Sequence, residues 1–247
     1  MRHPLDAVAS ELIDACQVLG AQGHEDKTLG HLSWRDPAGR GFWLKRSGIG
    51  LSEVRSAGDF LLLDFAGEVL AGDGERHIEW PIHAAVLSRR PDVSTVLHSH
   101  ARHAVLFSAL DEPLPLVGNE SVLFNRGVPR FTATADLIRT LELGGDVADV
   151  LADGEAALLR NHGIVVASDS LSNLVLTAVY LEVAAQNALD LLATGRPFVE
   201  VDADDAAAKR ARTTNDTVFS GFWSYLRRRN ERLRAGEGPA DEGKPPR

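Results

Sequence analysis

Short apolar runs separated by turn sequences constrain the fold of this chain most. Residues 28–35 and 41–45 are two such runs, and Asp36-Pro37-Ala38-Gly39 between them has the residue types of a tight turn. Residues 60–64 and 68–70 form a second closely spaced pair. Runs this close together pair as antiparallel strands, because parallel neighbours need a much longer crossover. The pattern predicts a largely antiparallel sheet rather than a doubly wound parallel one.

An apolar, β-branched run over residues 93–97 leads directly into His98 and His100. In a strand, residues two apart point to the same face, so the two imidazoles are expected to leave the sheet side by side. Divalent transition-metal ions readily accept neutral imidazole nitrogen. The pair therefore indicates half of a metal site, although an isolated His-x-His also fits two solvent-facing strand histidines.

A third histidine stands at a predicted hairpin tip. Apolar runs over residues 157–159 and 164–166 flank Arg160-Asn161-His162-Gly163, whose Asn and Gly suit the turn. Glu79 precedes a predicted helix over residues 81–90, which returns the chain to the strand that leads into His98 and His100. Three histidines leave one position of a catalytic zinc-type site open, and a carboxylate nearby completes the coordination or serves as a general base. The candidate site is therefore Glu79, His98, His100 and His162.

Composition places the chain among soluble globular proteins. Its 247 residues are 44% hydrophobic, which suits one domain over residues 1–232, and the polar stretch 233–247 is expected to be a disordered tail. The net charge of −9 argues against nucleic-acid binding. The single cysteine, Cys16, fits a reducing compartment and the apolar face of a helix over residues 4–20. Without a signal peptide or an apolar run of about 18 residues, the chain is expected to be cytoplasmic and to span no membrane.

The other predicted elements follow from periodicity and turn residues. We expect short strands over residues 121–124 and 130–132, a helix over 135–143 that Gly144-Gly145 ends, and a long helix over 171–193. A final polar helical region holds the basic runs 209–212 and 227–229. These runs are interpreted as solvated faces or subunit salt bridges.

The remaining histidines and several cations are weighed against structural roles. His83 lies one turn after Glu79 and is expected to pack behind the metal strand or to orient a ligand, and His77 to line the entrance. His103 is expected to share a helix face with His100, and His3 and His24 to lie at the surface. The candidates for pairing with a substrate carboxylate, all of which also fit structural charges, are Arg35, Lys45, Arg46 and Arg160.

Several motifs occur along the chain in a set order. They are Gly30-His31-Leu32-Ser33-Trp34-Arg35, Ser47-Gly48, the hairpin 59–67, Glu79-Trp80-Pro81-Ile82-His83, Arg90-Pro91-Asp92-Val93 before Val96-Leu97-His98-Ser99-His100, and Leu158-Leu159-Arg160-Asn161-His162-Gly163. In this order they resemble the class II aldolase/adducin family. The resemblance covers roughly residues 5–195.

The resemblance implies a fold, a metal and an assembly. The expected fold is a three-layer α/β/α sandwich with a mainly antiparallel central sheet, and the expected assembly is a homo-oligomer, most often a tetramer with sites at subunit interfaces. A divalent metal ion is expected on His98, His100 and His162, with zinc favoured and manganese or iron as alternatives. Glu79 is expected to be the catalytic acid/base. His31, Ser47 and Gly48 occupy the places where the family binds its small-molecule substrate.

The chain departs from the sugar-phosphate members of the family where they hold the phosphate. His31 replaces their asparagine, Lys45-Arg46-Ser47-Gly48 replaces Thr-Pro-Ser-Gly, and His77-Ile78 replaces a Ser-Ser pair. The last exchange removes two hydroxyl donors that a phosphate dianion needs. These motifs look more like a branch that includes decarboxylases. Phe131 stands nearest to the place of a tyrosine acid that some aldolases use, and it cannot donate a proton.

The sequence therefore predicts a metal-dependent carbon–carbon lyase acting on a non-phosphorylated hydroxy or oxo acid. Aldol cleavage and decarboxylation both form an enolate, which a divalent ion stabilises as a Lewis acid. Glu79 is expected to move the proton in a dry pocket that raises its pKa. Two alternatives stay open, a non-haem iron oxygenase on the same scaffold and a metal-free interaction protein of the adducin kind.

Overall fold

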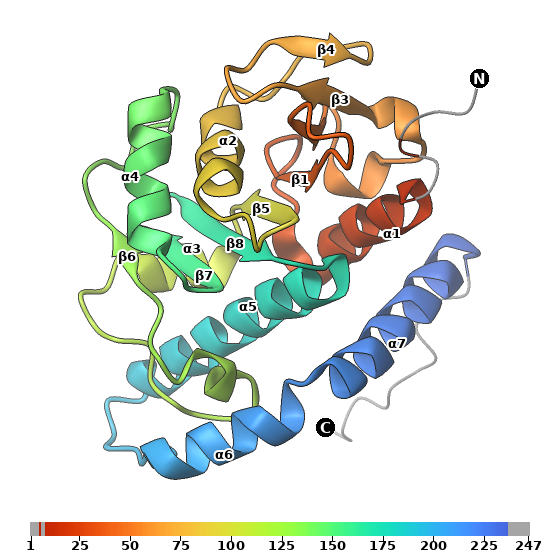
Figure 1. The fold of residues 1–247 in the computed structure, drawn as a ribbon. Helices are drawn as coiled ribbons and strands as arrows, with labels where there is room; N and C mark the ends of the chain where they lie inside the picture. Colours follow the sequence, from red (N-terminus) through yellow and green to blue (C-terminus); the bar gives the residue numbers. More distant parts are fainter. Residues whose placement is uncertain (1–4, 6–7, 237–247) are drawn as a thin grey trace.

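A mixed but mainly antiparallel sheet lies at the centre of the protein, with helices on both faces (Figure 1). The computed structural model describes Leu5 and residues 8–236. Within this part of the chain, eight strands form one sheet in the order β4-β3-β2-β1-β5-β8-β7-β6, and only the β6–β7 pair is parallel. The strands are β1 (His31–Arg35), β2 (Phe42–Lys45), β3 (Phe60–Leu63), β4 (Val69–Ala71), β5 (Thr95–Ser99), β6 (Arg130–Phe131), β7 (Ala156–Leu159) and β8 (Gly163–Ser168).

The helices divide between the two faces of this sheet. Helices α1, α3, α5 and α7 pack on one core, and α2 and α4 pack on the other. The three-layer α/β/α prediction is therefore confirmed. The helices are α1 (Ala9–Leu19), α2 (Trp80–Arg89), α3 (Arg102–Ser108), α4 (Leu141–Leu151), α5 (Leu171–Ala193), α6 (Ala203–Thr213) and α7 (Asp216–Arg234), with short turns η1 (Gly20–His24), η2 (Leu51–Glu53), η3 (Ala57–Asp59) and η4 (Glu120–Phe124).

The alternation of side chains along β5 decides what reaches the candidate site. Leu97 belongs to the core under α1 and α5, whereas Val96 belongs to the core under α2 and α4. Because successive strand residues face opposite ways, His98 lies on the same side as Val96. Strand β5 therefore presents His98 toward the α2 layer.

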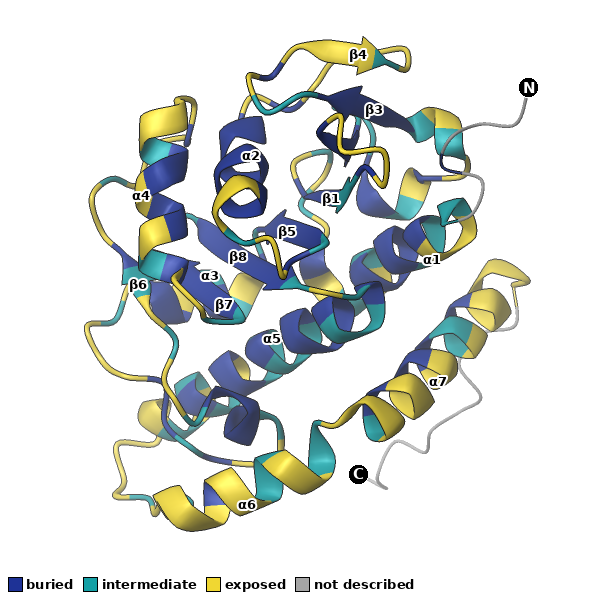
Figure 2. Ribbon diagram, viewed as in Figure 1, coloured by how far each residue is buried: buried dark blue, intermediate teal, exposed yellow. Residues whose placement is uncertain are grey.

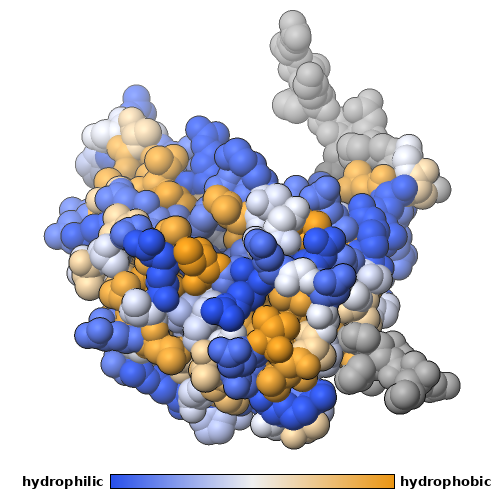
Figure 3. Space-filling view, turned by 90° about the horizontal axis from the view of Figure 1, so that it is seen from above, coloured by the Kyte–Doolittle hydropathy of each residue, from blue (hydrophilic) through white to orange (hydrophobic). Residues whose placement is uncertain are grey.

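Helix α5 is long and apolar enough to cross a membrane by length and composition, at a mean hydropathy of 1.3. It lies against the sheet, however, and the share of its most apolar stretch that is buried within the protein is 56% (Figure 2). Helices α6 and α7 lie outside α5 and expose most of their surface. Seen from above, hydrophobic side chains form small groups separated by hydrophilic ones (Figure 3). Helix α5 is thus a core helix of this fold.

Two predicted elements are wrong. Residues 121–124, predicted as a strand, belong to the helical turn η4. The helix predicted over 135–143 instead spans Leu141–Leu151 as α4, with Gly144 and Gly145 inside it. Thr140 starts α4 by accepting a hydrogen bond from the backbone N–H of Leu143. A Cβ on Gly144 would lie 2.5 Å from the carbonyl oxygen of Pro81, so this glycine lets α4 approach α2 instead of ending a helix.

The ends of the chain differ in part from the prediction. Helix α1 begins at Ala9 rather than at residue 4, and residues 1–4, with His3 among them, lie outside the described residues. Helix α7 runs to Arg234, and residues 237–247 of the predicted tail also lie outside the described residues. The basic runs on α6 and α7 include Arg210, paired with Glu155. They also include Arg227, paired with Asp14.

Candidate metal centre

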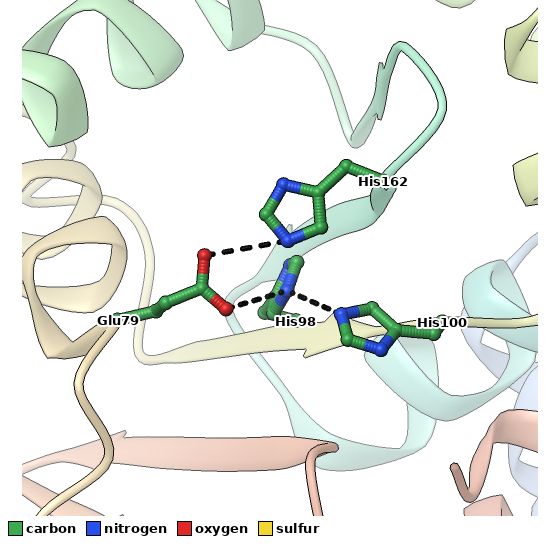
Figure 4. A group of neighbouring side chains, drawn as sticks. All are labelled: Glu79, His98, His100 and His162. Carbon is green, nitrogen blue, oxygen red and sulfur yellow. Dashed lines mark hydrogen bonds and ion pairs between the residues drawn. The ribbon is translucent and has the colours of Figure 1, made fainter. Parts of the chain in front are cut away.

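Four side chains from three separate segments converge at the C-terminal end of β5 (Figure 4). Glu79 immediately precedes α2, His98 lies on β5, His100 follows its end, and His162 occupies the turn between β7 and β8. Glu79 Oε2 lies 3.5 Å from His98 Nε2, Glu79 Oε1 lies 3.3 Å from His162 Nε2, and the Nε2 atoms of His98 and His100 are 3.2 Å apart. One potential ligand atom from each residue lies within 4.8 Å of the others.

Backbone and carboxylate partners fix the rings of His98 and His100. The Nδ1 atom of His98 lies 3.0 Å from the carbonyl oxygen of Ile164, which can only accept, so Nδ1 carries the proton. The Nδ1 atom of His100 lies 3.1 Å from Asp26 Oδ2 and donates in the same way. Both rings therefore direct the lone pair of Nε2 into the cluster, which is the arrangement of metal-binding histidines.

His162 has no comparable anchor. The turn that carries it is tight, with Asn161 at a φ of +57°. Its Nδ1 and Nε2 atoms are buried and make no hydrogen bond within the described residues, although Nε2 lies near Glu79. A buried polar atom without a partner is costly. A metal ion that accepts the lone pair of Nε2 would be the missing partner. The chemistry of these residues therefore fits a divalent metal ion.

The carboxylate of Glu79 is buried and held from two sides. Its Oε1 accepts a hydrogen bond of 2.8 Å from the backbone N–H of Ile138. Burial alone raises its pKa, but contacts with His162 and His98 and this hydrogen bond outweigh burial and hold the pKa well below its usual range. The sequence predicted a raised pKa from burial, and this prediction is wrong because the sequence does not reveal the imidazoles that face the carboxylate.

A second group of histidines lies next to the cluster. His31 is the cross-strand partner of His98, and its Nδ1 lies 2.6 Å from His83 Nε2. His83 Nδ1 in turn lies 2.7 Å from Ser33 Oγ, and the ring of His77 lies 4.3 Å from that of His31. Burial lowers the pKa of His77 to about 3 and holds those of His31 and His83 well below their usual range. All three rings are therefore neutral at pH 7.

The loop with Ser47 and Gly48 stands apart from the four-residue cluster. The N–H of Ser47 donates to the carbonyl oxygen of Glu75 at 2.8 Å, which ties this loop to the segment that carries His77. Gly48 adopts a φ of +80°, a conformation that favours glycine. Lys45 is fully buried and donates to the carbonyl oxygens of Arg46 and Ile49, and burial lowers its pKa to about 8. Lys45 thus shapes this loop from inside.

The structure gives three further residues contacts that the sequence did not predict. His24, expected at the surface, is buried, and its Nδ1 lies 3.0 Å from Ser99 Oγ. His103 faces Glu182 at 2.7 Å rather than the cluster. Asp26 was not singled out, because its contact with His100 spans 74 residues and no local pattern indicates it.

A pocket of about 410 Å³ opens over the cluster. The residues that line it are His100, His162, Asp26, Arg102, Val105 and Leu106. The pocket therefore borders two of the four cluster residues, whereas both ring nitrogens of His162 are buried.

A family model described as "Class II Aldolase and Adducin N-terminal domain" matches residues 10–189 of this chain. The chain belongs to this family. The resemblance inferred from its motifs is confirmed, and the fold agrees with a solved family structure. L-fuculose 1-phosphate aldolase from Glaciozyma antarctica PI12 shares 25% sequence identity with this class II aldolase domain at a TM-score of 0.79, over 92% of this chain and 89% of that one.

Relatives of this class II aldolase domain carry several names. The 5-methylthioribulose-1-phosphate/5-deoxyribulose-1-phosphate aldolase of Rhodospirillum rubrum is 28% identical over 213 residues, covering 86% of this chain and 94% of that one. The 3,4-dihydroxyphthalate decarboxylase of Arthrobacter keyseri is 29% identical over 210 residues, covering 78% of this chain and 82% of that one. The Meiotically up-regulated gene 14 protein of Schizosaccharomyces pombe is 29% identical over 153 residues, and this match spans 61% of the chain and 59% of that protein. The relatives named as aldolase and decarboxylase confirm the predicted enzyme class, a carbon–carbon lyase.

Proposed function

We propose that this class II aldolase domain is a divalent-metal-dependent lyase that cleaves a carbon–carbon bond of a non-phosphorylated hydroxy or oxo acid. The bond is broken by aldol cleavage or by decarboxylation. The observation that carries the proposal is the convergence of Glu79, His98, His100 and His162, with ligand atoms within 4.8 Å of one another. Two of these rings are oriented from behind by acceptors on Nδ1.

In this proposal His98, His100 and His162 hold the ion. Three histidines with an open position are typical of catalytic zinc, and manganese or iron also fits these donors. A bound divalent ion supplies a Lewis acid that stabilises negative charge on a substrate oxygen as the carbon–carbon bond breaks. Family resemblance also supports a homotetramer, and the single cysteine, Cys16, supports a cytoplasmic location.

Glu79 is the residue that we assign to proton transfer. Glu79 is a carboxylate at neutral pH and can therefore accept a proton, and its lowered pKa makes the proton easy to return. The N–H of Ile138 holds Oε1, while Oε2 lies on the side of His98. Glu79 is thus fixed beside the reacting position, where it takes a proton from substrate or water and returns it.

The neighbours of the cluster favour a substrate without phosphate. His31 and His77 are neutral at pH 7 because burial lowers their pKa values, so they bring no positive charge to a dianion. Ile78 offers no donor, and its side chain is exposed. A phosphate dianion is held by several charged or N–H donors. The 3,4-dihydroxyphthalate decarboxylase is named for a substrate without phosphate and agrees with this choice, whereas the two matched aldolases are named for sugar phosphates.

Metal analysis of protein purified without added metal tests this function. We expect about one zinc, manganese or iron ion per chain in the wild type and loss of that ion in His98→Ala and in His162→Ala. His103→Ala is the matched control, because His103 contacts Glu182 instead of the cluster. Circular dichroism checks that each variant is folded. No metal in the wild type after reconstitution with each ion would overturn the proposal, and iron together with oxygen consumption would favour an oxygenase.

A further inference from the structure

The pocket over the cluster contains a cation with no acidic partner. Arg102 is exposed, lines the pocket together with His100 and His162, and forms no ion pair within the residues that the structure describes. An arginine is usually neutralised or solvated, and at a reactive site it is a common anchor for oxyanions. Its position beside the cluster makes it available to a bound molecule.

The cations expected from the sequence to meet a substrate carboxylate are all engaged elsewhere. Arg35 donates to the backbone carbonyl oxygens of Leu87, Arg90 and Val93. Lys45 donates to two backbone carbonyl oxygens. Arg46 pairs with Asp59 and Arg160 with Asp111. None of these cations lines the pocket.

The backbone that carries Arg102 is held firmly. The carboxylate of Glu182 on α5 accepts hydrogen bonds from the N–H groups of His103 and Ala104 at 3.0 and 2.9 Å. It also contacts His103 Nδ1 at 2.7 Å. Arg102 is the first residue of α3, so these contacts fix its Cα relative to His100, which lies two residues earlier.

We infer that Arg102 binds a carboxylate group of the substrate at the mouth of the pocket, while Val105 and Leu106 contact an apolar part of the same molecule. This inference rests on the proposed function and specifies its substrate as an acid with an apolar body. Leu106 is half exposed and lies with Val105 on the pocket wall. A carboxylate matches one guanidinium through two parallel hydrogen bonds.

The charges around the pocket favour a carboxylate over a phosphate. Asp26 lines the same pocket as Arg102, and its carboxylate is already paired with Lys27 at 3.1 Å and hydrogen-bonded to His100. Arg102 is then the cation of the pocket wall that faces an incoming anion, and the charge of a phosphate dianion exceeds that of a single arginine. A carboxylate carries half that charge and uses Arg102 alone.

Binding of benzoate, benzamide and phenyl phosphate to the full chain tests this inference. Calorimetric titrations are made with wild type, Arg102→Met, Arg102→Lys and the control Arg196→Met, an exposed arginine beyond α5. We expect Arg102→Met to weaken benzoate binding about tenfold, Arg102→Lys to weaken it less, and neither to change benzamide binding. Phenyl phosphate should bind more weakly than benzoate.

Each titration is made with zinc-loaded and with metal-free protein. The effect of Arg102→Met should appear in both forms, which separates this inference from the metal-dependent function. Equal benzoate binding by wild type and Arg102→Met in both forms would overturn the inference, as would a stronger, Arg102-dependent binding of phenyl phosphate. Size-exclusion chromatography of each variant completes the test, because dissociation of an oligomer in Arg102→Met would assign Arg102 to a subunit contact instead.

Discussion

Asp26 accepts a hydrogen bond from Nδ1 of His100 at 3.1 Å, and so connects the segment after η1 to the end of the metal strand. His24, two residues earlier, contacts Ser99 at 3.0 Å on the opposite side of the same strand end. The triplet His98-Ser99-His100 is therefore braced from two sides by one short segment. Such outer contacts fix the orientation of a metal-binding ring and raise its basicity.

Removing the Asp26 carboxylate should weaken metal binding without unfolding the protein. We expect Asp26→Ala to lower zinc affinity about tenfold or more, and Asp26→Asn to lower it less, because the amide oxygen still accepts from His100. Competition with a chromophoric chelator measures both affinities. Asp190→Ala, an exposed aspartate on α5, is the control and should bind zinc like the wild type. Unchanged affinity in Asp26→Ala would show that His100 needs no brace.

Glu79→Gln should abolish proton transfer while leaving the metal in place. The amide oxygen can still accept from the N–H of Ile138, but glutamine cannot take a proton. We expect the zinc-loaded variant to exchange the methyl protons of pyruvate, a simple oxo acid, at least about 100-fold more slowly than the wild type in deuterated buffer. Proton NMR follows the exchange. Loss of zinc from the variant would instead make Glu79 a ligand, and equal exchange rates would remove it from the mechanism.

Acid should destabilise the protein partly through His24. Burial lowers the pKa of His24 to about 4, against an ordinary value of 6.5. Between these values the unfolded chain binds the proton more readily, so the stability present above pH 6.5 is lost as pH falls toward 4. Unfolding at these pH values is coupled to the uptake of up to one proton by His24. Replacing His24 by Asn should therefore reduce the slope of the unfolding free energy against pH by up to about 1.4 kcal/mol per pH unit.

Urea unfolding at pH 7, 5.5 and 4, followed by circular dichroism, measures that change for wild type and His24→Asn. We expect the unfolding free energy to fall more steeply with decreasing pH in the wild type than in His24→Asn. Both proteins keep part of this pH dependence, because His31, His77 and His83 also have lowered pKa values. If the unfolding free energy of the two proteins changed equally with pH, His24 would be protonated in the folded state at these pH values.

Two helical glycines should respond in opposite ways to alanine. In Gly144→Ala the new Cβ meets the carbonyl oxygen of Pro81, and separating α4 from α2 should cost about 1–3 kcal/mol of unfolding free energy. In Gly221→Ala on α7 nothing lies within 4 Å of the new Cβ, so alanine should stabilise by about 0.5–1 kcal/mol. Thermal unfolding compares the two variants with the wild type. A stable Gly144→Ala protein would contradict the tight packing described here.

The sequence by itself determined the elements whose signals are local. Turn residues between short apolar runs predicted the hairpins β1–β2, β3–β4 and β7–β8, all of which are antiparallel. The period of a strand placed His98 and His100 next to each other, and turn chemistry placed His162 at a hairpin tip. These predictions succeeded because a few neighbouring residues carry the whole signal. Sequence spacing alone made it plausible that Glu79 lies near the three histidines. The ordered family motifs then supported its assignment to the candidate site.

Only the tertiary structure decided contacts between distant segments and the electrostatics that they produce. Asp26 and His24 contact the end of β5 over more than 70 residues of sequence, and Gly144 lies inside α4 where that helix approaches Pro81 closely. Glu79 has a lowered pKa because three segments bring imidazoles and an N–H to it. The structure also showed that Arg102 lines the pocket and forms no ion pair with any described residue, whereas Arg35, Lys45, Arg46 and Arg160 are engaged elsewhere. The physical reason is that burial, charge pairing and close packing depend on neighbours in space, which no short stretch of sequence specifies.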